Sequence, residues 1–277
     1  MVPLLELDGV SKTFGGLLHR RRVAAVRGVS FALSGGRPEV FTLLGQSGSG
    51  KTTLARMILG LERPTAGSLR LDGEEVTRLS RGSARQRLLR LVQPIFQNPF
   101  EAFNPLRQVD HYLLLTARRF GGAGDRRAAQ TLTDTALRKV GLSLAEVAGR
   151  YPHELSGGQL QRLAIARALL AKPRLIIADE PVSMVDASLR MAIVNLFKTL
   201  RDELGISILY ITHDLATAYV VSDRIMIMRD GEVVESGNAR EVLTHPQHAY
   251  SRQLKGAVLV PRFTPPDVDG VTATPEH

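Results

Sequence analysis

Short apolar runs bounded by glycine, proline or charged residues are the first pattern along the chain. Runs of this length predict β-strands, and they lie at Leu4–Leu7, Val40–Leu44, Leu175–Ala178, Ile206–Ile211, Arg224–Met228 and Glu232–Glu235. Asp230-Gly231 lies between the last two runs, and this pair is typical of a two-residue hairpin turn. The sequence therefore predicts strands towards both ends of the chain and a hairpin in its last quarter.

Apolar residues at helical spacing dominate the middle of the chain. They predict helices at Lys51–Leu61, Ser80–Leu91, Ala128–Val140 and Leu160–Leu170. Between the second and third of these, Asn98–Pro105 contains two prolines and two asparagines, which predicts a loop. Residues from about 109 to 172 are mostly helical by the same criterion, so a helical block interrupts the strands.

This order of elements predicts an α/β fold with an insertion. We expect a core formed by residues 1–96 and 173–258, and a helical subdomain at 97–172 between its two parts. Gly15–Arg22 is expected to be a basic, solvated hairpin insertion, or a patch that faces lipid or a partner. The segment 259–277, rich in Pro, Thr and Asp, is expected to be disordered.

Composition narrows the choice of partners. The absence of cysteine excludes disulfides and thiolate-bound metal. A net charge of +9 favours anionic partners without choosing among them, while few aromatic residues and no tryptophan argue against a platform for single-stranded nucleic acid. No secretory signal and no apolar run of membrane-spanning length are visible. We therefore expect a cytosolic or peripheral protein that does not bind nucleic acid.

A glycine-rich loop with a lysine follows the strand Val40–Leu44. It matches G-x-x-x-x-G-K-[ST] and reads Gly45, Gln46, Ser47, Gly48, Ser49, Gly50, Lys51 and Thr52, with Thr53 next to it. Backbone N–H groups of such a loop, and the N-terminus of the helix after it, surround phosphate oxygens. Lys51 is expected to reach the β- and γ-phosphates of ATP, and the Thr52 hydroxyl to bind Mg²⁺.

A second helix start also suits an anion. Ser156, Gly157, Gly158 and Gln159 open the predicted helix Leu160–Leu170, with Ser156 as N-cap. Two phosphate-binding helix ends in one chain make sense if they bind different nucleotides, or if one nucleotide is shared between two chains. Together with Leu155, these residues read LSGGQ, and from here the chain resembles the ATP-binding cassette (ABC) family. The similar Leu33–Gly36 precedes a strand, so we interpret it as a turn.

Two acids follow the apolar strand Leu175–Ala178. They lie at the carboxyl end of the strand, where α/β folds bind ligands. Asp179 is expected to hold Mg²⁺, and Glu180 to act as general base towards water. His213 follows Ile206–Thr212 and can reach a γ-phosphate; its position matches the family's switch histidine.

The resemblance adds further residues. It implies that Gln97, in FQNP, is the glutamine that touches Mg²⁺ and water and relays their state to a membrane partner; Gln93 is the rival within a strand. It implies that Phe14 stacks on adenine, and that Asp186 contacts the mate across the dimer. The fold implied is a P-loop core with an antiparallel β portion and an inserted helical subdomain.

Three segments resemble the ATPases of oligopeptide, dipeptide and nickel importers: Phe96–Pro105, Glu180–Asp186 and His245–Tyr250. This resemblance implies an ATP-hydrolysing subunit on the cytoplasmic face of the membrane. Its partners would be two permeases, a second ATPase that is paralogous or identical, and, indirectly, an extracytoplasmic solute-binding protein. The solute would be peptide-like, with nickel or an oligosaccharide as alternatives. Phe100 and Phe103 are expected to be exposed for the permease, with burial of both rings in the helical subdomain as the alternative.

Three other functions remain open. An accessory ATPase of phosphonate breakdown resembles peptide importers closely. A regulatory scaffold that binds nucleotide without turnover is disfavoured by Glu180 and His213, and an exporter ATPase by the importer-like segments.

Overall fold

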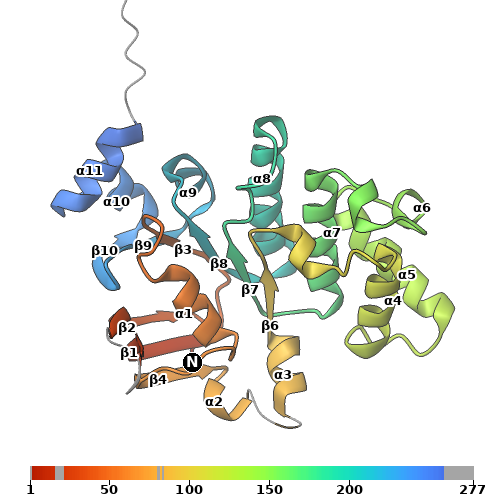
Figure 1. The fold of residues 1–277 in the computed structure, drawn as a ribbon, viewed down its shortest axis with the longest axis horizontal. Coiled ribbons are helices and arrows are strands. Elements are labelled where there is room, and N and C mark those ends of the chain that lie inside the picture. The colour runs from red at the N-terminus through yellow and green to blue at the C-terminus, as the bar shows by residue number, and fades with distance from the viewer. Residues whose placement is uncertain (1, 16–21, 80–81, 83, 259–277) are drawn as a thin grey trace, which may run out of the picture.

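The computed structural model describes residues 2–15, 22–79, 82 and 84–258 (Figure 1). Most of the predicted insertion Gly15–Arg22 and the whole segment 259–277 lie outside the described residues. None of the helices in the described part of the chain combines the length and the apolar character that a membrane span requires.

A six-stranded sheet forms the centre of the molecule. Its order is β10-β9-β3-β8-β7-β6, parallel except for β10. The strands are β3 (Val40–Leu44), β6 (Val92–Ile95), β7 (Leu175–Asp179), β8 (Ser207–Thr212), β9 (Arg224–Arg229) and β10 (Glu232–Asn238). The predicted hairpin is confirmed, since β9 and β10 are joined by Asp230 and Gly231, both with positive φ as a type I′ turn requires.

The central strands are buried on both faces, which explains why they read as uninterrupted apolar runs. Along β7 and β8, Ile176, Ala178, Ile208 and Tyr210 pack into the cluster shared with helices α7 (Gly157–Leu170) and α8 (Ala187–Leu204). The alternate residues Leu175, Ile177, Leu209 and Ile211 pack into the cluster shared with α1 (Lys51–Ile58) and the second sheet.

The second sheet is antiparallel, with the order β2-β1-β4-β5. It consists of β1 (Leu5–Phe14), β2 (Val23–Leu33), β4 (Ala66–Leu71) and β5 (Glu74–Glu75). The predicted strand Leu4–Leu7 forms only the start of β1, and the sequence reasoning did not identify β2, β4 or β5. The LSGG at Leu33–Gly36 is a turn before β3, as predicted, and its Ser34 hydroxyl accepts hydrogen bonds from the amides of Gly36 and Arg37.

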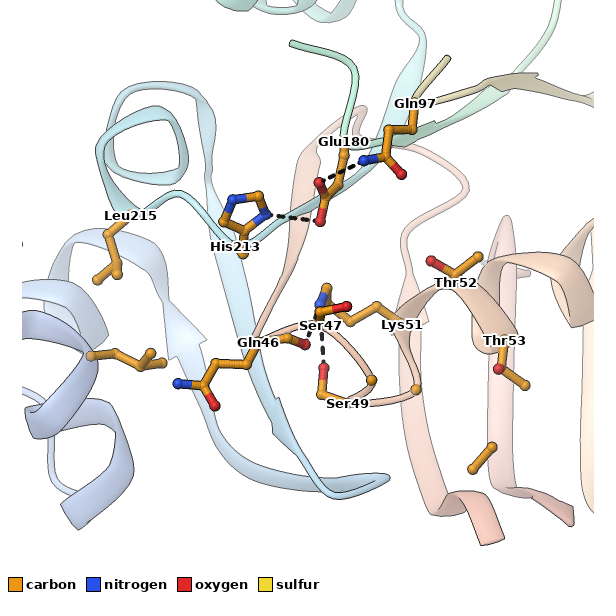
Figure 2. Close-up of a pocket in the computed structure, with 14 residues that line it drawn as sticks. Gln46, Ser47, Ser49, Lys51, Thr52, Thr53, Gln97, Glu180, His213 and Leu215 are labelled. Carbon is orange, nitrogen blue, oxygen red and sulfur yellow. Dashed lines mark hydrogen bonds and ion pairs between the residues drawn. The ribbon is translucent and has the colours of Figure 1, made fainter. Parts of the chain in front are cut away.

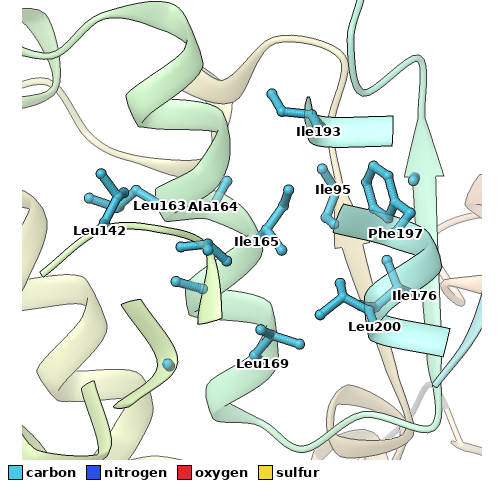
Figure 3. Close-up of a cluster of buried hydrophobic side chains, with 14 of the residues drawn as sticks. Ile95, Leu142, Leu163, Ala164, Ile165, Leu169, Ile176, Ile193, Phe197 and Leu200 are labelled. Carbon is cyan, nitrogen blue, oxygen red and sulfur yellow. The ribbon is translucent and has the colours of Figure 1, made fainter. Parts of the chain in front are cut away.

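A helical segment lies between β6 and β7. It contains η1 (Pro99–Ala102), α4 (Val109–Arg119), α5 (Arg126–Lys139), α6 (Leu144–Val147), η2 (Pro152–Glu154) and α7 (Gly157–Leu170). Figure 3 shows Ile165 and Leu169 of α7 pointing toward the side where Ile95, Phe197 and Leu200 gather. The last two belong to α8 (Ala187–Leu204), so the helical segment packs on the central sheet and on α8.

The remaining helices complete the core. They are α1 (Lys51–Ile58), α2 (Val76–Leu79), α3 (Ala84–Leu91), α9 (Leu215–Val221), α10 (Ala239–Thr244) and α11 (Ala249–Val258). In Figure 1, α10 and α11 lie at the β9–β10 edge of the sheet, opposite the helical segment. Tyr250 of α11 is buried there in a cluster with Leu44 and Leu243.

Candidate functional site

Four loops meet at one edge of the central sheet. The parallel strands β3, β6, β7 and β8 all end there, in the register that pairs Leu44 with Thr212, Asp179 with Ile211 and Ile95 with Ala178. The loops that follow these strands carry the glycine-rich segment, Gln97, Glu180 and His213 (Figure 2). The sheet topology therefore brings together side chains that are far apart in the sequence, at the edge where α/β folds bind ligands.

Two glycines of the loop are required by close backbone approach. A Cβ atom at Gly45 would lie 2.3 Å from the Met228 carbonyl oxygen, and one at Gly50 would lie 2.3 Å from the Ala25 carbonyl oxygen. Gly50 also has a φ of +100°, which disfavours any other residue. The loop can therefore lie against the backbone of Met228 and Ala25 only with glycine at these two positions. The first turn of α1 follows the loop and lies at the site.

The Lys51 ammonium group lies inside the loop. Its Nζ donates to the carbonyl oxygens of Gly45 at 2.7 Å and Gln46 at 2.9 Å, and to the Ser49 hydroxyl at 3.3 Å. Burial lowers the pKa of Lys51 below its ordinary value, although the carboxylates of Glu180 and Asp179 favour the charged form. The loop thus holds a nearly buried cation with neutral acceptors, so that its charge stays available to an anion.

Glu180 is the centre of a hydrogen-bonded group on the opposite side of the cavity. Its Oε1 is 2.9 Å from Nδ1 of His213, and its Oε2 accepts from Nε2 of Gln97 at 3.4 Å. Because an ionised carboxylate only accepts, Nδ1 of His213 carries the proton in this contact. Glu180 has a φ of +46°, an uncommon value for a residue with a side chain. This backbone is held by its amide, which donates to the Ile211 carbonyl at 2.9 Å.

Asp179 and Thr52 suit a hard cation. Burial raises the pKa of the Asp179 carboxyl group, and a hydrogen bond with the Thr52 hydroxyl opposes this effect. A carboxylate and a hydroxyl are oxygen donors of the kind Mg²⁺ prefers, and Mg²⁺ usually takes only one or two protein ligands beside water and phosphate oxygens. Within the described residues, no group of three His, Cys, Asp or Glu side chains could hold a metal alone. The donor set therefore fits Mg²⁺ that arrives with a phosphate ligand.

A cavity of about 650 Å³ lies between the loop around Lys51 and the group around Glu180, and the predicted residues Gly45 and Asp179 are not among its lining residues. It is lined by the predicted residues Gln46, Ser47, Gly48, Ser49, Gly50, Lys51, Thr52, Thr53, Gln97, Glu180 and His213. It is also lined by Ala25, Leu215 and Leu254, which the sequence reasoning missed. Leu215 lies close after His213 and could have been found from that position, whereas no sequence signal points to Ala25 or Leu254.

Residues 26–183, more than half of the chain, match the family described as ABC transporter. The chain belongs to the ABC transporter family. The resemblance and the fold predicted from the sequence are thereby confirmed.

The relatives of this ABC protein include import ATP-binding proteins. The glutathione import ATP-binding protein GsiA of Salmonella typhimurium is 43% identical over 263 residues, which are 93% of this chain but 41% of GsiA. The oligopeptide transport ATP-binding protein AmiF of Streptococcus pneumoniae is 38% identical over 261 residues, which are 93% of this chain and 82% of AmiF. The chain thus spans less than half the length of GsiA and most of AmiF.

Solved ABC cassettes share the fold. The dimeric structure of a post-hydrolysis state of the cassette MJ0796, bound to ADP and Pi, matches with a TM-score of 0.75 and 29% identity, over 85% of this chain and 99% of that chain. The structure of cbiO1 from Clostridium perfringens, part of the complex cbiONQ, matches with a TM-score of 0.75 and 25% identity, over 88% and 91% of the two chains.

The ABC signature residues lie away from the cavity. Ser156, Gly157, Gly158 and Gln159 are not among its lining residues. Ser156 and Gln159 form a reciprocal capping box at the start of α7. A Cβ atom at Gly158 would lie 2.9 Å from Cδ1, the end of the Leu189 side chain on α8. The signature residues of this chain therefore do not line the cavity of the same chain.

Phe14 also lies outside the cavity lining. Its ring is 39% exposed, and Nζ of Lys12 lies 4.9 Å from the ring centroid. The described structure therefore does not place Phe14 among the residues that line the cavity around Lys51.

The structure of the loop after Gln97 contradicts one expectation, the exposure of Phe103. Phe100 is 41% exposed, as predicted, but Phe103 is buried at 3% exposure. The Phe103 ring packs edge-on against Tyr112 at 5.7 Å, and the Arg167 guanidinium lies 5.6 Å from its centroid. The expectation that both rings are exposed is therefore wrong for Phe103, because α4 and α7 close over it. Gln93 lies within β6, as predicted, and is not part of the cavity lining.

Proposed function

We propose that this chain binds and hydrolyses Mg-ATP as the ATP-binding subunit of an importer for a peptide-like solute. The observation that carries the proposal is one cavity lined on one side by Lys51 and on the other by Glu180, with His213 and Gln97 bonded to Glu180. The names of GsiA and AmiF, glutathione import and oligopeptide transport, support the choice of solute class.

The glycine-rich loop would bind the phosphates. On binding, oxygens of the β- and γ-phosphates would accept from the Lys51 ammonium, which the neutral acceptors of the loop hold in position. The N-terminus of α1, which starts at Lys51, adds partial positive charge. The loop residues Gln46 to Thr53 would then surround the phosphates with backbone N–H groups, and Phe14 would stack on the adenine ring.

Thr52 and Asp179 would hold Mg²⁺, with Gln97 close to its water shell. When bound, Mg²⁺ neutralises charge on the β- and γ-phosphate oxygens. Glu180 would accept a proton from the water that attacks the γ-phosphorus as the bond to ADP breaks. The Nδ1–H of His213, 2.9 Å from Oε1, holds the carboxylate in place and stabilises its charge. In this account Glu180 is the general base and His213 a positioning residue that also senses the γ-phosphate.

A second chain would complete the site. Ser156 is exposed at a capped helix N-terminus that has no nucleotide loop of its own chain beside it. We propose that residues Ser156–Gln159 of an identical or paralogous ATPase close over the γ-phosphate, and that Asp186 contacts that chain. The MJ0796 cassette, whose structure with ADP and Pi is a dimer, supports this arrangement.

The permeases would contact the loop that begins at Gln97. Phe100 is 41% exposed and Leu106 is 83% exposed, so this loop presents two apolar side chains to solvent. The same loop reaches the catalytic group, because the Gln97 amide donates to Glu180. This contact would hold the chain at the cytoplasmic face of the membrane, with the solute-binding protein acting indirectly. The helical segment 97–172 would then be the subdomain that meets partner chains.

Uptake into vesicles tests this function. The chain would be reconstituted with a second ATPase, two permeases and a solute-binding protein. Uptake of glutathione, a tripeptide and Ni²⁺ would be measured with ATP on the ATPase side. We expect ATP-dependent uptake of a peptide-like solute that stops with Glu180→Gln. ATP hydrolysis without uptake of any of these solutes would contradict the importer and favour an accessory ATPase.

A further inference from the structure

The nucleotide loop is supported from behind by the C-terminal part of the chain. The Gly231 amide donates to the Ser49 carbonyl at 3.2 Å, and the backbone at Met228 leaves no room for a side chain at Gly45. On the side of the loop that faces α11, the amide of Gln46 donates to the hydroxyl of Tyr250 at 3.4 Å. Figure 2 shows Gln46 on the side of the loop that faces the blue C-terminal helices. Leu254, one turn after Tyr250 on α11, lines the cavity itself.

Tyr250 and Lys51 hold the same peptide group from its two ends. The carbonyl oxygen of the Gly45–Gln46 peptide accepts from Nζ of Lys51 at 2.7 Å, and its N–H group donates to the Tyr250 hydroxyl. The two bonds leave the planar peptide in opposite directions, so together they fix the orientation of its plane. Each bond also polarises the peptide in the sense that strengthens the other.

The Tyr250 hydroxyl is a rigid acceptor because Tyr250 is itself held on several sides. Its side chain is buried at 4% exposure, and the Arg229 guanidinium lies 4.9 Å from its ring centroid. Its amide donates to Nδ1 of His248 at 3.2 Å. The turn before it is fixed by Glu235, whose carboxylate accepts from the amides of Gln247 at 2.8 Å and His248 at 3.1 Å.

We propose that Tyr250 is a positioning residue for the nucleotide site, which fixes the Gly45–Gln46 peptide and through it the Lys51 ammonium. The segment from His245 to Val258 is then a brace that sets the affinity of the loop for ATP. This inference rests on the proposed ATP site and assigns a role to a segment that the function above does not use. Without the hydroxyl, the peptide keeps the Lys51 bond at its carbonyl but loses the bond at its N–H group, so its plane is less constrained and the loop would lose part of the geometry that receives phosphate.

Tyr250→Phe tests the proposal because it removes only the hydroxyl and keeps the ring beside Arg229. Tyr219→Phe is the matched control, since Tyr219 lies on α9 with its side chain 51% exposed. Three quantities would be measured for both variants: the Kd for ATP by titration calorimetry, KM and kcat for hydrolysis, and hydrogen exchange of the nucleotide-free peptide that contains Gln46. We expect Tyr250→Phe to raise Kd and KM about two- to tenfold, the range of one ordinary hydrogen bond. Because Tyr250 does not face the reacting atoms, kcat should stay within about twofold, and the Gln46 amide should exchange faster.

The outcomes are distinguishable. If Tyr250→Phe matches Tyr219→Phe in Kd, KM and Gln46 exchange, the proposal is overturned, even when its melting temperature falls, because Tyr250 then has a packing role only. A fall in kcat at unchanged KM would also overturn it. If the unaltered protein binds no ATP, the proposed function itself fails; if it binds ATP and only the Tyr250 effect is missing, the proposed function stands without the brace.

Discussion

Replacing Phe103 and Phe100 separately by alanine distinguishes a packing role from a docking role on the loop after Gln97. Phe103 is buried against Tyr112, and Arg167 covers its ring while donating to the Ala102 carbonyl. Phe103→Ala would leave a cavity between α4 and α7 and remove the ring that lies against the Arg167 guanidinium. Burial already lowers the pKa of Arg167, which indicates how far this charge is withdrawn from solvent.

The expected effects of the two substitutions on stability differ greatly. A buried Phe→Ala substitution costs about 3–5 kcal/mol of unfolding free energy. At about 2–4 °C per kcal/mol for a chain of this size, the melting temperature should fall by roughly 6–20 °C. Phe100 is 41% exposed, so Phe100→Ala should change stability by no more than about 0.5 kcal/mol, or about 2 °C.

Two assays check this pair. Thermal unfolding of the isolated subunit should show a large fall for Phe103→Ala and almost none for Phe100→Ala. Co-purification with the permeases should be reduced by Phe100→Ala while ATP binding stays intact. Equal melting temperatures for the two variants would refute the packing argument. Normal assembly and normal uptake per ATP with Phe100→Ala would refute the docking argument and favour an accessory ATPase.

Three further substitutions test the nucleotide pocket, each by titration with nucleotide. Lys51→Ala should weaken ATP binding by about 1.5–3 kcal/mol, roughly 10- to 150-fold in Kd, because a charge-assisted contact is lost; an unchanged Kd would remove Lys51 from the site. Phe14→Ala should weaken binding of ATP and GTP equally if its ring only stacks, and unaltered affinity for both would leave Phe14 with a structural role. Gly50→Ala should abolish ATP binding in a folded protein, because the new Cβ atom would lie 2.3 Å from the Ala25 carbonyl oxygen. Gly124→Ala is the control, since a Cβ atom there would have nothing within 4 Å. Equal ATP affinity of the two variants would contradict the argument.

The parts of the site that sequence could predict are local. The loop from Gly45 to Thr52 can be identified from one strand–turn–helix unit. Asp179 and Glu180 lie at the end of an apolar strand and can be identified from that position. The capping box of Ser156 and Gln159 is likewise set by neighbouring residues. In each case the backbone geometry depends on a few consecutive residues, so composition and spacing are sufficient.

The parts that sequence could not predict depend on contacts between distant segments. The order β8-β7-β6 places His213 and Gln97 on either side of Glu180, and spacing along the chain does not encode that order. The proline-bounded loop signal at Asn98–Pro105 was correct for the backbone, with a 3₁₀ turn within it, but the burial of Phe103 is decided by α4 and α7.

Strand β2 was not predicted from the sequence for a different reason. Val23–Leu33 alternates between buried and exposed positions but contains arginine, glycine and serine, so it lacks the uninterrupted apolar run that marked the central strands. It is stabilised as a strand by pairing with β1 over most of its length. Tyr250 and Leu254 carried no site signal at all, because α11 reaches the nucleotide loop only in the folded chain.

The most direct test of the account is Glu180→Gln, assayed for ATP binding, hydrolysis and dimer formation in the same preparation. The amide can still accept from Nδ1 of His213, 2.9 Å away in the native group, but it cannot take the proton of the attacking water. The account predicts ATP affinity near that of the unaltered protein, almost no turnover, and an ATP-bound dimer that persists in gel filtration. Hydrolysis near the unaltered rate would contradict the assignment of Glu180, and a variant that binds ATP but remains monomeric would contradict the shared site.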